Sequence, residues 1–147
     1  MKRHICLAGF NVCNDCLLIC HLKERHKVTL IESFSDVLVE SRHDRPAVGY
    51  RLRGILASVD VLVLDSVSKS RESPTRRSFS RLVDFLDVAR TTFPALSIVL
   101  VEMAPEADVE RRAKLFEAGV KEYVVYPYDS SEVLRLILKR VRSTLVG

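Results

Sequence analysis

Residues 59–65 read Val-Asp-Val-Leu-Val-Leu-Asp, a short and almost continuous apolar run that ends in an acid. A run of this length with β-branched residues predicts a strand at Val59–Leu64, and its largely apolar character predicts burial on both faces. The run Ser97–Val101, Ser-Ile-Val-Leu-Val, has the same character. We expect these two strands to lie in the middle of a parallel sheet that helices cover on both sides.

The rest of the chain alternates short apolar runs with helical patterns, which is typical of βαβ units in a parallel sheet. Further strands are predicted at His4–Ala8, Lys27–Ile31 and Glu122–Val125. Helices are predicted at Cys13–Arg25, within Ser33–Ser58, at Phe79–Thr91, at Asp108–Ala118, and after a cap at Ser130 or Ser131. The basic segment Ser66–Ser78 is predicted to be a loop. The pattern indicates a three-layer α/β/α, doubly wound parallel sheet of five strands with about five helices.

The composition fits a single domain that spans residues 1–147. A length of 147 residues with 48% hydrophobic content can bury a core without disulfides or a structural metal. The formal net charge of +4 is a moderate basic excess, and the basic residues lack the patterns that accompany nucleic-acid recognition. No stretch approaches the roughly 20 apolar residues that span a bilayer. We therefore expect a cytoplasmic protein without membrane contact, and direct nucleic-acid binding is not expected.

Two passages of the sequence resemble the receiver domains of response regulators. Asp65 ends an apolar strand, as the phosphoacceptor of that family does. Residues 117–129, Glu-Ala-Gly-Val-Lys-Glu-Tyr-Val-Val-Tyr-Pro-Tyr-Asp, resemble the family's passage from its fourth helix through its fifth strand to its fifth helix. The order and spacing agree along nearly the whole chain. The resemblance implies a flavodoxin-like, CheY-like fold and a role in two-component signalling or transcriptional regulation.

The positions that carry phosphoryl chemistry in that family differ in this chain. Where the family has two adjacent acids that hold magnesium, the chain has Gly9 and Phe10 with no acid beside them. The family's Ser or Thr after strand four corresponds to Glu102, and its Lys before the proline corresponds to Tyr126. Phosphoryl transfer needs cations that neutralise the transferring oxygens. Asp65 is therefore only phosphoacceptor-like, and the resemblance implies a non-enzymatic pseudo-receiver without a cofactor.

Two alternatives stay open at this point. The first is a receiver that is phosphorylated on Asp65 by a non-standard route. The second is a small-ligand or redox-sensing flavodoxin-like domain that uses either the cleft around Gly9, Phe10, Asp65 and Tyr126 or a cluster of cysteines.

That cluster consists of Cys13, Cys16 and Cys20, at positions i, i+3 and i+7 of the first predicted helix. This spacing places all three on one side of the helix, and we interpret them as small apolar residues that pack the helix on the sheet. Tetrahedral zinc needs four ligands, and no second cysteine pair follows, so no metal site is expected. Cys13, near the helix start, is the thiol to test for reactivity.

Charged and aromatic residues in the last third of the chain predict a contact surface. Arg111, Arg112 and Lys114 make the predicted fourth helix basic on its polar side, which we interpret as a solvated face. Receivers typically dimerise or meet partners through their fourth helix, fifth strand and fifth helix. The candidate interface residues are Arg112, Tyr123, Arg135 and Lys139. We expect a protein partner or a homodimer, with an output domain where the chain is longer.

Overall fold

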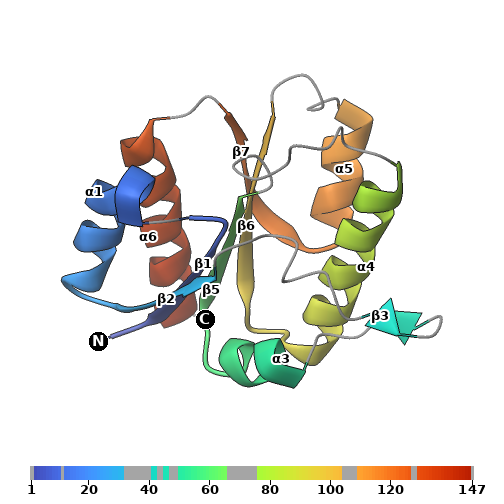
Figure 1. Ribbon diagram of the computed structural model, residues 1–147, viewed down its shortest axis with the longest axis horizontal. Coiled ribbons are helices and arrows are strands. Elements are labelled where there is room, and N and C mark those ends of the chain that lie inside the picture. Colours follow the sequence, from blue (N-terminus) through green and yellow to red (C-terminus); the bar gives the residue numbers. More distant parts are fainter. Residues whose placement is uncertain are drawn as a thin grey trace.

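The computed structural model describes residues 2–10, 12–31, 41–42, 45–46, 50–65, 76–103, 109–126 and 129–146. A five-stranded parallel sheet in the order β2-β1-β5-β6-β7 forms the centre of the molecule (Figure 1). Its strands are β1 (His4–Ala8), β2 (Lys27–Ile31), β5 (Val61–Asp65), β6 (Ser97–Met103) and β7 (Val120–Tyr126). A separate antiparallel pair joins β3 (Ser41–Arg42) to β4 (Arg45–Pro46). The predicted parallel sheet is confirmed, with β5 at its centre.

Helices cover both faces of this sheet. They are α1 (Val12–Lys23), α3 (Tyr50–Leu56), α4 (Arg76–Thr92), α5 (Val109–Glu117) and α6 (Ser130–Val146). Figure 1 shows α1 beside α6 on one side of the sheet, with α4 and α5 together on the other. The helix predicted within Ser33–Ser58 is represented by α3, whereas residues 33–40 of that segment lie outside the described ones. The three-layer architecture expected from the sequence is confirmed.

Side chains of the strands alternate between two apolar cores. On β5, Val61 and Val63 pack with residues of α1 and α6, whereas Leu62 and Leu64 pack with residues of α3, α4 and α5. Every residue of β1 and β5 is buried. A strand that is buried on both faces needs apolar residues at successive positions, which is the pattern of residues 59–65.

Some boundaries differ from those predicted. Helix α4 begins at Arg76, inside the segment expected to be a loop, and residues 66–75 of that segment lie outside the described ones. The predicted cap of α6 at Ser130 or Ser131 is wrong. Asp129 caps the helix instead, because its Oδ1 accepts the backbone N–H of Ser131 at 3.1 Å. A carboxylate at this position satisfies a helix donor that has no partner within the helix.

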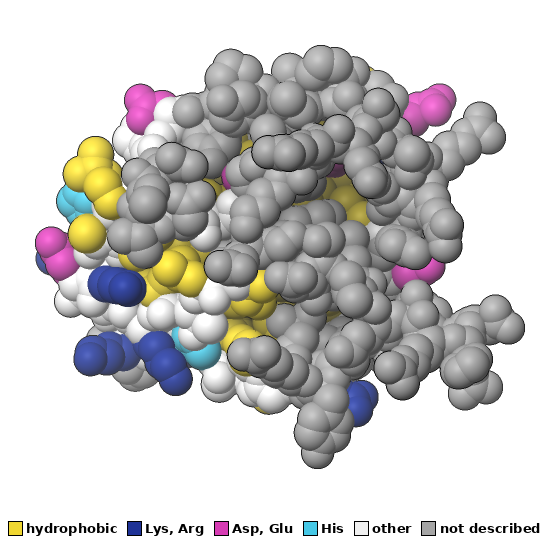
Figure 2. Space-filling view, viewed as in Figure 1, with side chains coloured by type: hydrophobic (Ala, Val, Ile, Leu, Met, Phe, Trp, Pro, Cys, Tyr) yellow, Lys and Arg dark blue, Asp and Glu magenta, His cyan; other side chains and the backbone are white. Residues whose placement is uncertain are grey.

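The interpretation of the α1 cysteines as packing residues is also wrong for Cys16 and Cys20. Cys16 and Cys20 are exposed. Figure 2 shows hydrophobic side chains, a class that includes cysteine, on the surface over α1. The residues that pack α1 on the sheet are Leu18, Ile19 and Leu22. With 3.6 residues per turn, this leucine and isoleucine stripe lies on the side of the helix away from positions 16 and 20. The side chain of Cys13 lies outside the described ones.

Within the described part of the chain, none of the helices combines the length and the apolar character needed to cross a membrane.

Candidate functional site

The carboxyl ends of three neighbouring strands bring the predicted site residues to one edge of the sheet. β1 ends just before Gly9, and β5 ends at Asp65. Asp65 pairs with Val101 of β6, so Glu102 lies one residue beyond that pair. Ligands of open parallel sheets bind outside this edge, and the edge is therefore the candidate functional site.

Gly9 lies directly against the backbone of Asp65. Its φ is +92°, and a Cβ placed on it would lie 2.6 Å from the carbonyl oxygen of Asp65. The N–H of Gly9 donates to the carbonyl of Ile31 at 2.9 Å, which ties this turn to β2. Positive φ and the close approach each require glycine. An acidic side chain cannot occupy position 9 unless the backbone of β1 or β5 moves.

Phe10 belongs to the apolar core and offers no ligand to a cation. Its side chain is 1% exposed and packs in the cluster that α1 and α6 share with the sheet. Among the described residues, no group of three or more His, Cys, Asp or Glu side chains could hold a metal ion. Tyr126 ends β7, but its side chain lies outside the described ones. Gly9 and Phe10 thus bring no acidic side chain to this edge of the sheet.

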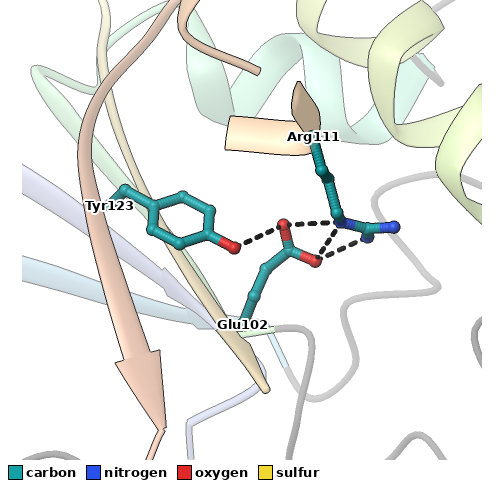
Figure 3. A network of polar contacts seen from close by, with 3 residues as sticks. All are labelled: Glu102, Arg111 and Tyr123. Atoms are coloured by element: carbon teal, nitrogen blue, oxygen red, sulfur yellow. Dashed lines mark hydrogen bonds and ion pairs between the residues drawn. The ribbon is translucent and has the colours of Figure 1, made fainter. Parts of the chain in front are cut away.

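Glu102 is the centre of a buried polar network at the end of β6. Its side chain is only 4% exposed. The Nε of Arg111 donates to the two carboxylate oxygens at 3.1 and 3.0 Å, and Nη2 donates to Oε2 at 2.5 Å. The hydroxyl of Tyr123 donates to Oε1 at 3.1 Å. Figure 3 shows the carboxylate held between the guanidinium group and the phenol, so its charge is matched within the domain.

Arg111 therefore does not belong to a solvated face as predicted. Its side chain is 19% exposed and forms the ion pair with Glu102. The neighbouring Arg112 and Lys114 are exposed, as expected. On α5 the buried residue is Leu115, and position 111 lies one turn before it on the same side of the helix.

Tyr123 links β7 to α5. Burial, and then the negative charge of Glu102, raise the pKa of the Tyr123 phenol. The hydroxyl therefore stays protonated and donates a hydrogen bond to the carboxylate. The guanidinium carbon of Arg112 lies 4.9 Å from the centre of its ring, a cation–π distance. The ring of Phe116 lies 6.4 Å away, centre to centre. Tyr123 thus contacts both Glu102 and Arg112 from a half-buried position on β7.

Glu102 and Asp65 lie on opposite faces of the sheet. Leu64 packs towards α3, α4 and α5, so strand alternation places Asp65 on the side of α1 and α6. Leu100 also packs towards α4 and α5, which places Glu102 on that side, where Arg111 meets it. The two carboxylates are thus turned to different layers, and Asp65 itself is buried.

The charged members of the predicted interface are exposed. Arg112 lies on α5, and Arg135 and Lys139 lie on α6. The ammonium group of Lys139 lies 3.2 Å from the carboxylate of Glu122 on β7, which Arg140 also contacts at 3.2 Å. These ion pairs therefore join β7 to α6 at the predicted interface.

Two apolar residues of this surface were missed by sequence reasoning. Val109 and Phe116 of α5 are 85% and 43% exposed. They are seven residues apart, hence on one side of the helix, and this spacing could have identified them. They lie on the same helix as Arg112 and extend the candidate interface beyond its charged residues.

Comparison with known proteins relates this architecture to solved structures. No protein-family model matches the sequence, and no curated protein matches it significantly. The signal receiver domain of a LuxO repressor-type protein from Vibrio parahaemolyticus superposes with a TM-score of 0.66 at 11% identity, covering 99% of this chain and 95% of that one. The signal receiver domain of an HD domain-containing protein from Pseudomonas fluorescens Pf-5 gives 0.63 at 14% identity over the full length of both. The chain has the receiver fold.

A third neighbour places this fold within a longer chain. NtrX from Brucella abortus superposes with a TM-score of 0.62 at 13% identity, covering 99% of this chain. This chain spans 28% of the length of NtrX. At such identities the likeness concerns the receiver fold alone.

Proposed function

We propose that this chain is a cytoplasmic, non-enzymatic pseudo-receiver, which acts through protein contacts and is not phosphorylated by the ordinary magnesium-dependent route. The observation that carries the proposal is the buried Glu102, paired with Arg111 and Tyr123 at the end of β6. In the receiver family a small hydroxyl residue corresponds to this position. Here the side chain of Glu102 joins β6, β7 and α5 through contacts that need no phosphoryl group.

The residues around Asp65 support the same conclusion. Gly9 cannot carry an acid beside the Asp65 carbonyl, and Phe10 is part of the core. A divalent cation that bridges phosphoryl oxygens requires several oxygen ligands in addition to a single aspartate. Such a cation would neutralise the negative charge of a transferring phosphoryl group, and among the described residues Gly9 and Phe10 bring no acid beside Asp65 to hold it.

Phosphorylation itself provides the test. The protein is incubated with a small phosphodonor and magnesium, and its intact mass is measured. We expect no added phosphoryl group. A stoichiometric adduct that disappears in Asp65→Asn would overturn the proposal and establish the alternative, a receiver phosphorylated on Asp65 by another route.

We further propose that the contact surface lies on α5, β7 and α6. The exposed Val109 and Phe116 offer apolar area on α5, where Arg112 adds positive charge, and the exposed Arg135 and Lys139 add positive charge on α6. Apolar centres with charged rims are common at protein interfaces, where rim charges govern association rates and partner choice. The partner is either a second copy or another protein, including an output domain in a longer chain.

Sedimentation of the wild type and of an Arg112→Glu, Lys139→Glu variant, with and without a candidate partner, tests this surface. Association should weaken in the variant. Lys23→Glu on α1 is the control, since it reverses an exposed charge on a helix outside the proposed surface. An unchanged association constant in the double variant, or an equal loss in Lys23→Glu, would contradict the assignment.

A small-ligand or redox-sensing role is the second candidate function. The observation that favours it is the exposure of Cys16 and Cys20 on α1.

A further inference from the structure

The exposed thiols of α1 have no part in the receiver chemistry considered above. Cys16 and Cys20 are both free and exposed, one helical turn apart. The packing of α1 depends on Leu18, Ile19 and Leu22 instead. Cysteine is ordinarily among the most buried residues, so two exposed thiols on one helix face call for an explanation other than packing.

The spacing of the pair determines what it can bind. Side chains at i and i+4 of a helix are neighbours, with about 5–6 Å between their Cβ atoms. Two thiolates at this separation can bind one ion between them. Soft thiolate ligands select soft ions such as copper(I), which accepts a coordination number as low as two, whereas zinc requires four ligands. Two cysteines from one helix therefore suit copper(I) and are insufficient for zinc.

The charge of such a complex is also matched on α1. The ion and the two thiols form a bis-thiolate anion, Cu⁺ + 2 RSH → [Cu(SR)₂]⁻ + 2 H⁺. Lys23 lies three residues beyond Cys20 and seven beyond Cys16, which places it on the same side of the helix, and its side chain is exposed. Its ammonium group can offset the single negative charge.

We propose that Cys16 and Cys20 form a two-thiolate binding site for a soft monovalent metal ion of the copper(I) class. This inference does not depend on the proposed pseudo-receiver function. It assigns to α1 a second site, which lies on the helix layer rather than at the carboxyl edge of the sheet.

The chain contains its own control for thiol chemistry. Cys6 lies in β1 and is completely buried, and burial raises the pKa of its thiol to about 12. A thiol in this state is protonated and inaccessible, so it does not compete for the ion. Cys13 precedes Cys16 by three positions in α1 and is the residue from which the proposed pair must be distinguished.

Competition with bicinchoninate tests the site. The reduced full-length protein is titrated without oxygen into the coloured copper(I)–bicinchoninate complex, and the loss of colour measures transfer of the ion. We expect one copper(I) per chain in the wild type and in Cys13→Ser. Cys16→Ser and Cys20→Ser should each bind at least about a hundredfold more weakly, because either change removes the second point of attachment.

Both serine substitutions are at exposed positions, so unfolding by urea should show unchanged stability and confirm that lost binding is local. Lys23→Glu should weaken binding by about two- to fivefold, and Lys114→Glu on α5 should not. The proposal is overturned if the wild type takes up no copper(I), if either Cys16→Ser or Cys20→Ser keeps wild-type affinity, or if Cys13→Ser loses it.

Discussion

Two polar clusters occupy opposite ends of the same sheet, and they are built from different chemistry. At the amino ends of the strands, the ring of His4 contacts Thr29 Oγ1 at 2.6 Å and Ser58 Oγ at 3.1 Å. At the carboxyl end, Glu102 meets the guanidinium group of Arg111. The first cluster joins a histidine to hydroxyl groups, and the second is a buried ion pair.

The histidine ring of the amino-end cluster favours its neutral form. Burial, followed by the charge of Lys27, lowers the pKa of His4, which favours the neutral ring. The backbone N–H of His4 donates to Asp60 Oδ2 at 2.9 Å, which connects β1 to the turn before β5. Burying a neutral group that has hydrogen-bond partners costs only a modest amount of free energy.

The ion pair at the carboxyl end depends on both of its members. A buried charge that loses its partner carries a large desolvation penalty, whereas a neutral cluster that loses one member loses a hydrogen bond or two. The comparison therefore predicts that equivalent substitutions at the two ends of the sheet have unequal effects.

The largest effect is expected for Arg111→Met. This change keeps the aliphatic part of the side chain and leaves the Glu102 carboxylate buried without its cation. We expect the free energy of unfolding to fall by about 3–5 kcal/mol, measured by urea denaturation. Arg112→Met, at the adjacent exposed position, should change it by less than about 1 kcal/mol. Equal small effects would show that the ion pair does not distinguish this end of the sheet.

A smaller effect is expected for His4→Leu at the opposite end. The Thr29 hydroxyl would lose its 2.6 Å contact, while Ser58 Oγ would keep its hydrogen bond to the carbonyl of Ile55. We expect a loss of about 1–3 kcal/mol in the free energy of unfolding. Adding Thr29→Val should restore part of it, because both partners are then apolar. A double variant no more stable than His4→Leu alone would contradict this account.

Acidification should act through the same histidine. The pKa of His4 in the folded protein is below its ordinary value of 6.5, and burial lowers the pKa of His26 in the same direction. Above pH 6.5 these histidines are neutral in both the folded and the unfolded protein, whereas below it they bind protons first in the unfolded chain. The free energy of unfolding should therefore decline as the pH falls from 6.5. His4→Leu should decline less steeply over this range, and equal slopes would remove His4 from the explanation.

The smallest effect is expected for Lys139→Ala on α6. Its ion pair with Glu122 is exposed on the lysine side, and Arg140 contacts the same carboxylate at 3.2 Å. Exposed ion pairs contribute about 0–1 kcal/mol, so urea denaturation should show little change in stability. A loss comparable with that of Arg111→Met would mean that burial does not separate the two ion pairs.

The sequence predicted the fold well because its strand patterns are local. His4–Ala8 and Lys27–Ile31 have the predicted bounds, and the apolar runs identified the central strands. The face of α1 was wrong because cysteine and leucine are both apolar, and spacing alone does not decide which stripe packs. The role of Glu102 was missed because its partner lies on another element, and only the packing of α5 on the sheet brings the two together.

The contact between Gly9 and the Asp65 carbonyl has a consequence for engineering. A designer who wished to convert this chain into a metal-dependent phosphoacceptor would begin by placing an acid after β1. At position 9 any Cβ meets a backbone oxygen at 2.6 Å, which no rotamer can relieve. Because the obstacle is main chain, the conversion is not reachable by exchanging side chains one at a time. It requires a rebuilt turn first, in which the residue after β1 no longer has positive φ.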